Sequence, residues 1–210
     1  MRIPLAREGY PFIFPPFAVF ALASFLRLWT VGAFFFALGF FVLWFFRDPE
    51  RTIPPGADSI VSPADGKIIK IERKMEEKLL KDEAVLISVF MNVFNVHVNR
   101  APFSGRVIRV LYNPGKFISA NLDKASLENE QNSVLMEAAN RKRFVFRQIA
   151  GLIARRIVCR VSEGDELKKG ERIGMIRFGS RLDVYLPPTC RINVAVGEKV
   201  KAGSSILAWW

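Results

Sequence analysis

The N-terminal quarter of the chain constrains the fold more than any other feature, because it is almost wholly apolar. Residues 28–46 are a 19-residue stretch without a charged side chain, and a helix needs about 20 residues to cross the core of a bilayer. A shorter apolar stretch, residues 11–26, precedes it and contains three prolines, so it can form a second span or lie in the membrane interface. We therefore predict that residues 1–46 form a hydrophobic membrane anchor of one or two apolar segments.

The rest of the chain is strongly basic. The whole chain has 31 Lys and Arg against 20 Asp and Glu, and residues 1–46 hold only three of those cations and one of the anions. Excess positive charge on a domain tethered to a membrane favours an anionic lipid surface as its partner. Nucleic acid is the other partner of many basic proteins, but the chain contains no zinc finger, recognition helix or aromatic RNA-binding motif. We expect a membrane and an anionic phospholipid as partners, and no nucleic acid.

The residues after the anchor and the two cysteines indicate the compartment. Arg47 and Arg51 follow the long apolar stretch, and cations at that position place the next domain on the cytoplasmic side of the cell membrane. Cys159 and Cys190 are isolated, so they give neither a disulfide framework nor the spacing of a metal site. We expect a reducing compartment and no metal.

The remaining sequence has the pattern of a β domain. Residues 47–58 are a linker that contains proline and glycine, and residues 59–210 carry short β-branched and aromatic runs separated by turn residues. Such spacing is typical of an all-β sandwich or barrel. One extended run is predicted at residues 84–98, one or two helical turns at 75–82, and a long polar loop at 121–132.

Two internal echoes refine this fold class. The segment Gly164–Gly170 recurs 33 residues later as Gly197–Gly203, and Pro63–Ile68 is echoed by Pro102–Val107. The first pattern (Gly, acid, any, apolar, Lys, any, Gly) is similar to the hairpin turn of biotinyl- and lipoyl-type β domains, where glycine gives the turn its backbone freedom. No lysine occupies a carrier turn, so no swinging arm is expected. We predict a mainly β, biotinyl/lipoyl-like sandwich or barrel-type catalytic domain behind the N-terminal anchor.

The Gly179–Ser180 pair and the single histidine, His97, are the candidates for chemistry. A serine that follows glycine can attack the carbonyl of that glycine, because no side chain crowds the bond. The attack needs a base, and imidazole is the usual base near neutral pH. Strand alternation over residues 94–102 places Asn95, His97 and Asn99 on one polar face. The alternative remains open at this point: a Gly-Ser turn or bulge and an ordinary strand histidine.

Five motifs together resemble the phosphatidylserine decarboxylase family, specifically its short, membrane-anchored branch. Their order and spacing make the resemblance specific, and it covers essentially the whole chain. The motifs are Phe46-Arg47-Asp48-Pro49, Pro63-Ala64-Asp65-Gly66, Phe94-Asn95-Val96-His97-Val98-Asn99, Tyr112-Asn113-Pro114-Gly115 and Phe178-Gly179-Ser180-Arg181.

The resemblance implies a pyruvoyl enzyme that is made by self-cleavage between residues 179 and 180. Ser180 would attack the Gly179 carbonyl, with His97 as the base and Asp65 orienting the imidazole. Loss of ammonia would leave a covalent pyruvoyl group on the small chain, and the large chain would end at Gly179. The mature enzyme would convert phosphatidylserine to phosphatidylethanolamine and carbon dioxide in phospholipid biosynthesis, with the pyruvoyl group as the electron sink.

The chain departs from longer family members near its histidine. Those members carry a second histidine just before the matched one, and Phe94 or Asn95 occupies that region here. The group that reprotonates the product is therefore left open. We expect Arg181, or the loop with Tyr112 and Lys116, to bind the phosphate or carboxylate of the substrate.

Other functions stay open from the sequence. A related serine-headgroup lipid such as archaetidylserine would undergo the same headgroup chemistry, and a self-processing relative could act on a soluble amino acid. A non-catalytic, membrane-anchored adaptor of the biotinyl-like class would remain one chain, whereas the enzyme would yield a large chain and a 31-residue small chain. Whether copies form a homo-oligomer is also left open.

Overall fold

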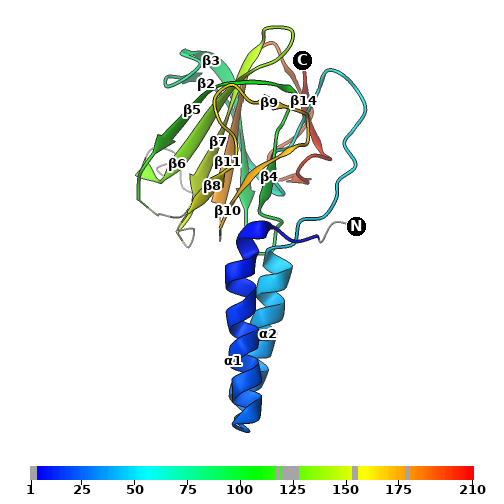
Figure 1. The fold of residues 1–210 in the computed structure, drawn as a ribbon. Coiled ribbons are helices and arrows are strands. Elements are labelled where there is room, and N and C mark those ends of the chain that lie inside the picture. The colour runs from blue at the N-terminus through cyan, green and yellow to red at the C-terminus, as the bar shows by residue number, and fades with distance from the viewer. Residues whose placement is uncertain (1–3, 117–118, 120–127, 153–155, 178–179) are drawn as a thin grey trace. The chain divides into compact units, whose positions relative to one another are not determined.

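The computed structural model describes residues 4–116, 119, 128–152, 156–177 and 180–210. It divides into two compact units, Met1–Glu50 and Arg51–Trp210, and each is described by itself. The first unit is helical and the second is built of strands (Figure 1).

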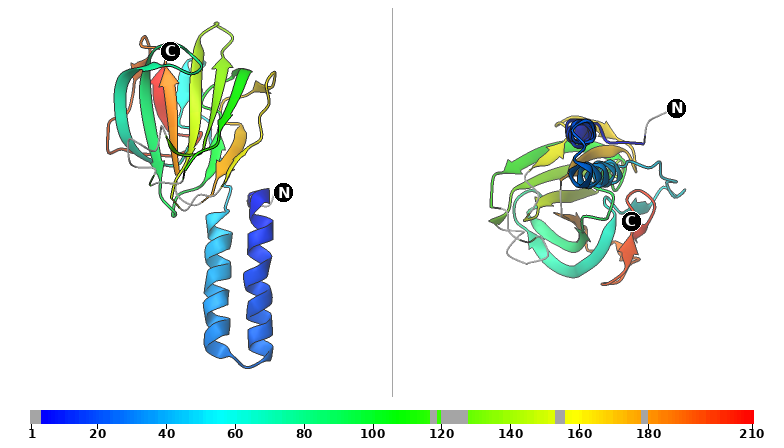
Figure 2. Two further views of the ribbon diagram at one scale, coloured as in Figure 1. Left: turned by 90° about the vertical axis from the view of Figure 1, so that its left-hand side faces the viewer. Right: turned by 90° about the horizontal axis from the view of Figure 1, so that it is seen from below.

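The first unit is a helical hairpin. It contains a short 3-10 turn at Arg7–Gly9 and the helices α1 (Tyr10–Phe25) and α2 (Trp29–Phe45). The helices lie side by side (Figure 2), and the chain reverses between them at Arg27, whose φ is 58°. Gly39 allows the close approach, because a Cβ there would lie 2.8 Å from the Phe17 ring. Among the described residues no helix combines the length and apolarity needed to cross a membrane, so the predicted anchor is not confirmed as a spanning segment.

The second unit contains one large sheet and two small ones. The large sheet has the strand order β13-β2-β3-β11-β7-β6-β5-β9, and the small sheets have the orders β1-β14-β12 and β4-β10-β8. The large sheet curls strongly (Figure 2). The second unit is built of strands, which confirms the prediction of a mainly β domain. The strands are β1 (Ser59–Val61), β2 (Gly66–Glu76), β3 (Asp82–Met91), β4 (Val98–Arg100), β5 (Gly105–Asn113), β6 (Gln131–Glu137), β7 (Arg143–Ala150), β8 (Ile157–Cys159), β9 (Glu166–Leu167), β10 (Arg172–Ile176), β11 (Ser180–Leu186), β12 (Arg191–Ile192), β13 (Lys199–Val200) and β14 (Ile206–Trp209).

The main hydrophobic core lies against one face of the large sheet. Alternate residues of a strand point to opposite faces, and in β11 the side chains of Leu182, Val184 and Leu186 enter this core. Tyr185 packs into a smaller cluster on the other face. The even-numbered residues of β11 therefore face the main core, and the odd-numbered residues face the opposite side of the sheet.

The two sequence echoes combine into one repeated structural unit. Each glycine-bounded segment supplies a two-residue strand that pairs with the first residues of a long strand: Leu167 of β9 opposite Gly105 of β5, and Val200 of β13 opposite Gly66 of β2. The glycines that bound the segments have positive φ, at Gly164 (94°), Gly170 (78°), Gly197 (97°) and Gly203 (73°). The predicted glycine-dependent turns are confirmed.

Hydrogen bonds within the two copies also correspond. The Ala202 amide donates to Oδ1 of Asp65 over 2.8 Å, and the Lys169 amide donates to Oγ of Ser104 over 2.8 Å. Asp65 and Ser104 hold the same place in the two copies, each directly before the glycine that begins a long strand. Part of the role of Asp65 is therefore the ordinary one of holding a turn.

The prediction of one extended run over residues 84–98 is wrong. β3 ends at Met91 and β4 begins at Val98. Between them the Asn92 amide donates to Oδ1 of Asn95 over 2.9 Å, and the Phe94 amide donates to Oδ1 of Asn92 over 2.9 Å. Asparagine side chains that bond nearby amides replace the sheet ladder with a turn, so strand alternation does not position His97.

Two further boundaries differ from prediction. Residues 75–82 form the end of a β hairpin rather than helical turns, because Oε2 of Glu76 accepts hydrogen bonds from the Leu79 and Leu80 amides at 2.7 and 2.8 Å. The predicted polar loop over residues 121–132 ends early, since β6 begins at Gln131. Residues 121–127 of that prediction lie outside the described residues.

Candidate active site

Several chain segments meet where β11 begins. Ser180, its first residue, is in register with Met91 at the end of β3 and with Ala150 at the end of β7. Since both pairings are antiparallel, the loops that follow β3 and β7 leave the sheet at the edge where β11 enters it. The end of β5 reaches the same edge, because Asn113 pairs with Gln131, which pairs with Ile149 of β7.

Ser180 is fully buried on the core side of β11, the side that also carries Leu182. Its Oγ has no hydrogen-bond partner among the residues that the structure describes. Leaving a buried hydroxyl unpaired costs about 1–3 kcal/mol, and such groups in native structures call for an explanation. A hydroxyl kept for reaction is one explanation. Gly179, the other half of the predicted cleavage site, lies outside the described residues.

His97 is also fully buried. Its Nδ1 lies 3.0 Å from the carbonyl oxygen of Asn95, and a carbonyl can only accept, so Nδ1 carries the proton and Nε2 is left as the basic nitrogen. His97 directly precedes β4, whose Val98 pairs with Met175 of β10. The chain continues from β10 to Ser180, so the topology brings the only histidine to the segment that leads into β11.

Asp65 makes its described contacts with two other residues. Nη2 of Arg51 lies 2.9 and 2.8 Å from its two carboxylate oxygens, and Oδ1 also accepts from the Ala202 amide. The role of Asp65 in orienting His97 stays a prediction. Arg51 was not predicted as a site residue, because it belongs to none of the five motifs and only the fold brings it to Asp65.

A chain of buried amide side chains connects the two sheets beside Ser180. Nε2 of Gln148 donates to Oδ1 of Asn99 over 2.9 Å, and Nδ2 of Asn132 lies 3.4 Å from Oε1 of Gln148. Nδ2 of Asn99 lies 3.7 Å from the sulfur of Met91, the register partner of Ser180. Gln148 was not predicted as a site residue, because it belongs to none of the five motifs. Neutral amides can donate and accept, which suits them to hold a polar headgroup or the loop of the histidine.

Arg181 does not share the face of Ser180. It is the next residue in the strand, so its side chain projects to the opposite face. There Nε donates to Oδ1 of Asp183 over 2.6 Å and Nη2 donates to Oδ2 over 2.9 Å. The structure thus does not bring this guanidinium to the Ser180 hydroxyl, and its role in substrate binding stays a prediction without geometric support.

Tyr112 and Lys116 both contact the segment that precedes β6. The Tyr112 hydroxyl donates to Oε1 of Glu130 over 3.1 Å, and burial, followed by the Glu130 carboxylate, raises the pKa of Tyr112. Nζ of Lys116 lies 3.3 Å from Oε2 of Glu128. The Glu130 carbonyl accepts from the Ala150 amide over 3.0 Å, so this segment adjoins the strand beside Ser180. Substrate binding by Tyr112 and Lys116 stays a prediction.

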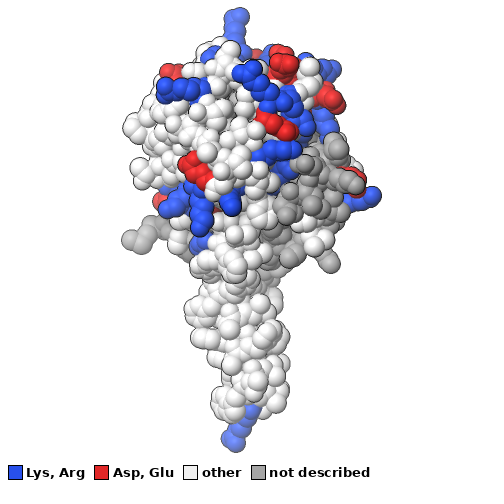
Figure 3. All heavy atoms as spheres, turned by 180° about the vertical axis from the view of Figure 1, so that it is seen from behind, with Lys and Arg blue, Asp and Glu red and all other residues white. Residues whose placement is uncertain are grey.

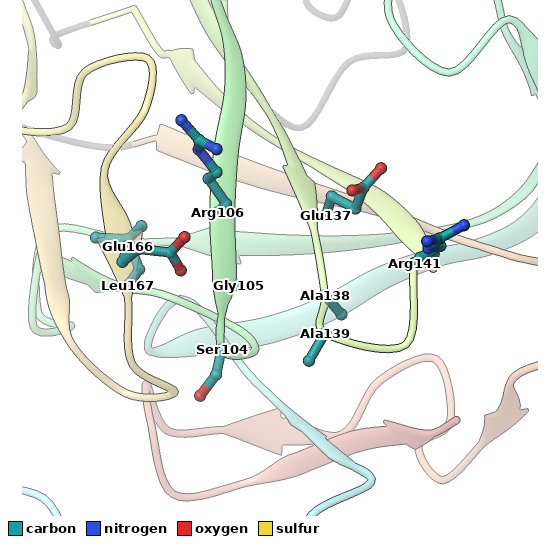
Figure 4. A pocket seen from close by; sticks show the side chains of 9 residues that line it. All are labelled: Ser104, Gly105, Arg106, Glu137, Ala138, Ala139, Arg141, Glu166 and Leu167. Carbon is teal, nitrogen blue, oxygen red and sulfur yellow. The ribbon is translucent and has the colours of Figure 1, made fainter.

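A separate hollow lies at the other end of β5 and β6 (Figure 4). Its lining includes Gly105 at the start of β5, Glu137 at the end of β6 and Glu166 of β9. None of the predicted catalytic residues lines it, so it is not the candidate active site.

Comparison with known proteins identifies the family to which the chain is similar. The family model for phosphatidylserine decarboxylase matches residues 38–208. A relative from Syntrophus aciditrophicus (strain SB), named phosphatidylserine decarboxylase proenzyme, is 51% identical over 208 residues, which is 97% of this chain and 96% of the relative. Relatives of the same name from Magnetococcus marinus and Desulfotalea psychrophila are 49% and 48% identical, over 95% and 98% of this chain and 92% and 96% of their own lengths. The chain belongs to the phosphatidylserine decarboxylase family.

Proposed function

We propose that the chain is a phosphatidylserine decarboxylase proenzyme that cleaves itself before Ser180 and then converts phosphatidylserine to phosphatidylethanolamine and carbon dioxide. The observation that carries the proposal is the buried, unpartnered Oγ of Ser180 at the edge to which the topology also brings His97. Family membership favours this function over a non-catalytic adaptor. Archaetidylserine is the second candidate substrate, since its headgroup is the same.

Self-cleavage needs a nucleophile and a base. Oγ of Ser180 forms a bond to the Gly179 carbonyl carbon while Nε2 of His97 takes the hydroxyl proton. The bond from that carbon to the Ser180 nitrogen then breaks, and the imidazolium returns the proton to this nitrogen, which leaves as an amine. The resulting ester joins the two chains until a base removes the Cα proton of Ser180 and Oγ leaves with the large chain as the Gly179 carboxylate. Water then supplies the carbonyl oxygen at the former Ser180 Cα, and the nitrogen leaves as ammonia.

In the described structure the Asn95 carbonyl holds Nδ1 of His97, and Arg51 holds the Asp65 carboxylate. Asp65 therefore has to replace the Asn95 carbonyl at Nδ1 when it orients the imidazole.

The surroundings of Ser180 fit a pyruvoyl group derived from that residue. Its Oγ has no hydrogen-bond partner among the described residues, so elimination of that oxygen breaks no hydrogen bond there. When formed, the group supplies an electron-accepting carbonyl for decarboxylation. The chain's own part is to hold the headgroup with Asn99, Asn132 and Gln148 and to move protons at His97.

The helical hairpin supports membrane attachment in this proposal. Its exposed side chains include Phe14, Phe25 and Trp29, which are 68%, 83% and 69% exposed, and the visible face of the hairpin is almost free of charge (Figure 3). A large exposed apolar surface marks a membrane or protein contact. We place the hairpin in the cell membrane and the catalytic unit on the cytoplasmic side, with the cations after α2 supporting that orientation. The repeated glycine turns support the finer biotinyl/lipoyl-like assignment of the β unit.

Intact-mass analysis of the purified full chain tests the proposal. We expect a large chain and a 31-residue small chain that carries a carbonyl in place of its terminal amine. Ser180→Ala is expected to remain at 23.8 kDa and to be inactive. The processed protein should release carbon dioxide from phosphatidylserine. A wild-type chain that stays intact and releases none would overturn the proposal in favour of the adaptor.

A further inference from the structure

Exposed apolar side chains gather at the edge of the sheet that holds Ser180. Phe94, Tyr112 and Leu152 are 63%, 55% and 64% exposed, and we call these three residues the apolar rim. Phe94 lies in the turn after β3 and Leu152 follows the end of β7, and these are the strands that flank Ser180 in register. Tyr112 is the penultimate residue of β5, which ends at the same edge.

The rim is held in place by hydrogen bonds from neighbouring polar groups. The turn of residues 92–95 is closed by bonds of the Asn92 and Asn95 side chains to nearby amides, which fixes the backbone of Phe94. The Tyr112 hydroxyl is fixed by Glu130. A surface that is ordered before it binds loses less entropy on binding.

Cations accompany the rim. Arg156, which is exposed, follows β7 in the chain as Leu152 does, and its charge opposes the rise in the pKa of Tyr112. The Lys116 side chain is 75% exposed, with Glu128 as its ion-pair partner. Apolar side chains flanked by cations suit the surface of a bilayer that contains anionic lipid, where the former enter the interface and the latter meet phosphates.

We propose that the apolar rim docks the catalytic unit onto an anionic phospholipid bilayer, so that a lipid headgroup reaches Ser180 while its acyl chains stay in the membrane. The inference rests on the proposed function and adds to it the surface by which the buried site meets its substrate. It follows from chemistry: transfer of acyl chains into water is unfavourable, whereas the polar headgroup can leave the bilayer towards the buried amide side chains of Asn99 and Gln148.

The test compares two forms of substrate. The full chain is reconstituted into vesicles of neutral lipid with phosphatidylserine, and turnover of this bilayer lipid is measured beside turnover of a water-soluble, short-chain phosphatidylserine. The variant is the double substitution Phe94→Ser and Leu152→Ser. Val196→Ser is the matched control, because Val196 is 60% exposed but lies in the turn before β13, outside the loops that form the rim.

We expect the double variant to cleave itself normally and to turn over the soluble substrate at the wild-type rate. Its turnover of bilayer lipid should fall about tenfold, as expected when two apolar contacts with the interface are lost, while Val196→Ser changes neither. Equal turnover of bilayer lipid by wild type and double variant would overturn the proposal, as would an equal loss on both substrates. Failure of the proposed function would look different, since the wild type would then turn over neither substrate.

Discussion

Nη2 of Arg51 donates to both carboxylate oxygens of Asp65, at 2.9 and 2.8 Å. The two side chains are only 13% and 12% exposed, so the pair is shielded from most solvent. Arg51 comes from the linker that precedes the first strand, and Asp65 is the carboxylate expected to orient His97. The contact makes the linker part of the candidate catalytic apparatus.

Arg51→Ala should slow self-cleavage by about tenfold or more, because a hydrogen bond to a charged group contributes about 1.5–3 kcal/mol. Arg51→Lys keeps the charge and should recover part of the rate. The measurement is the fraction of cleaved chain against time, by intact mass. Arg191→Ala, at an exposed position, is the control, and a normal rate for Arg51→Ala would show that Asp65 needs no such support.

Asp65→Ser separates the two roles of Asp65. Ser104 performs the turn-holding role in the second copy of the repeat, so the serine variant should keep the fold, as judged by circular dichroism. It should lose self-cleavage, because a hydroxyl cannot stabilise the protonated imidazole as a carboxylate does. Normal cleavage by a folded Asp65→Ser variant would reduce Asp65 to a turn residue.

Gln148→Leu removes the central member of the buried amide chain at similar volume. Oδ1 of Asn99 and Nδ2 of Asn132 then lose their bonds to Gln148, and each buried polar group left unsatisfied costs about 1–3 kcal/mol. We expect a lower free energy of unfolding in urea and a lower turnover of phosphatidylserine. Asn140→Leu, on the exposed β6–β7 turn, is the comparison, and a variant as stable and active as wild type would remove the amide chain from the site.

Glu76 predicts a pH dependence of stability. Burial alone would raise its pKa, but the Leu79 and Leu80 amides and the Arg147 guanidinium together lower it below its usual value of 4.5. A depressed pKa stabilises the fold above the unfolded-state value, and the stabilisation is lost as pH falls through the folded-state pKa. Chemical unfolding should therefore show wild type more stable than Glu76→Gln near neutral pH, with the difference shrinking as the pH falls below the usual carboxyl pKa of 4.5. A constant difference would contradict the assignment.

Much of the fold could be predicted where local chemistry decides it. The repeated glycines marked positive-φ turns because few other residues adopt them. Alternation in β11 accounts for which of its side chains enter the core. The run over residues 84–98 failed because two asparagine side chains interrupt the ladder, a choice that propensity does not reveal.

The candidate site was predictable as residue types and less so as contacts. Ser180 and His97 follow from the chemistry of an attack on a glycine carbonyl. The ion pair of Arg51 with Asp65 and the bond from Gln148 to Asn99 join residues 14 and 49 positions apart, and only the folded chain brings them together. Arg181 was assigned to substrate although its neighbour in the strand, Ser180, already occupies the core side.

β11 is hydrogen-bonded to β3 on one side and to β7 on the other. Cleavage of the chain before Ser180 would therefore create a new chain end but leave β11 held in the sheet. The new terminus would stay where it was made, without recruitment of a second polypeptide. If the cleaved protein unfolded, its two chains would have to find each other before β11 could pair again with β3 and β7, because the backbone that joined them in the precursor is cut. Folding then belongs to the precursor, and the working lifetime of the product is set by how slowly it opens.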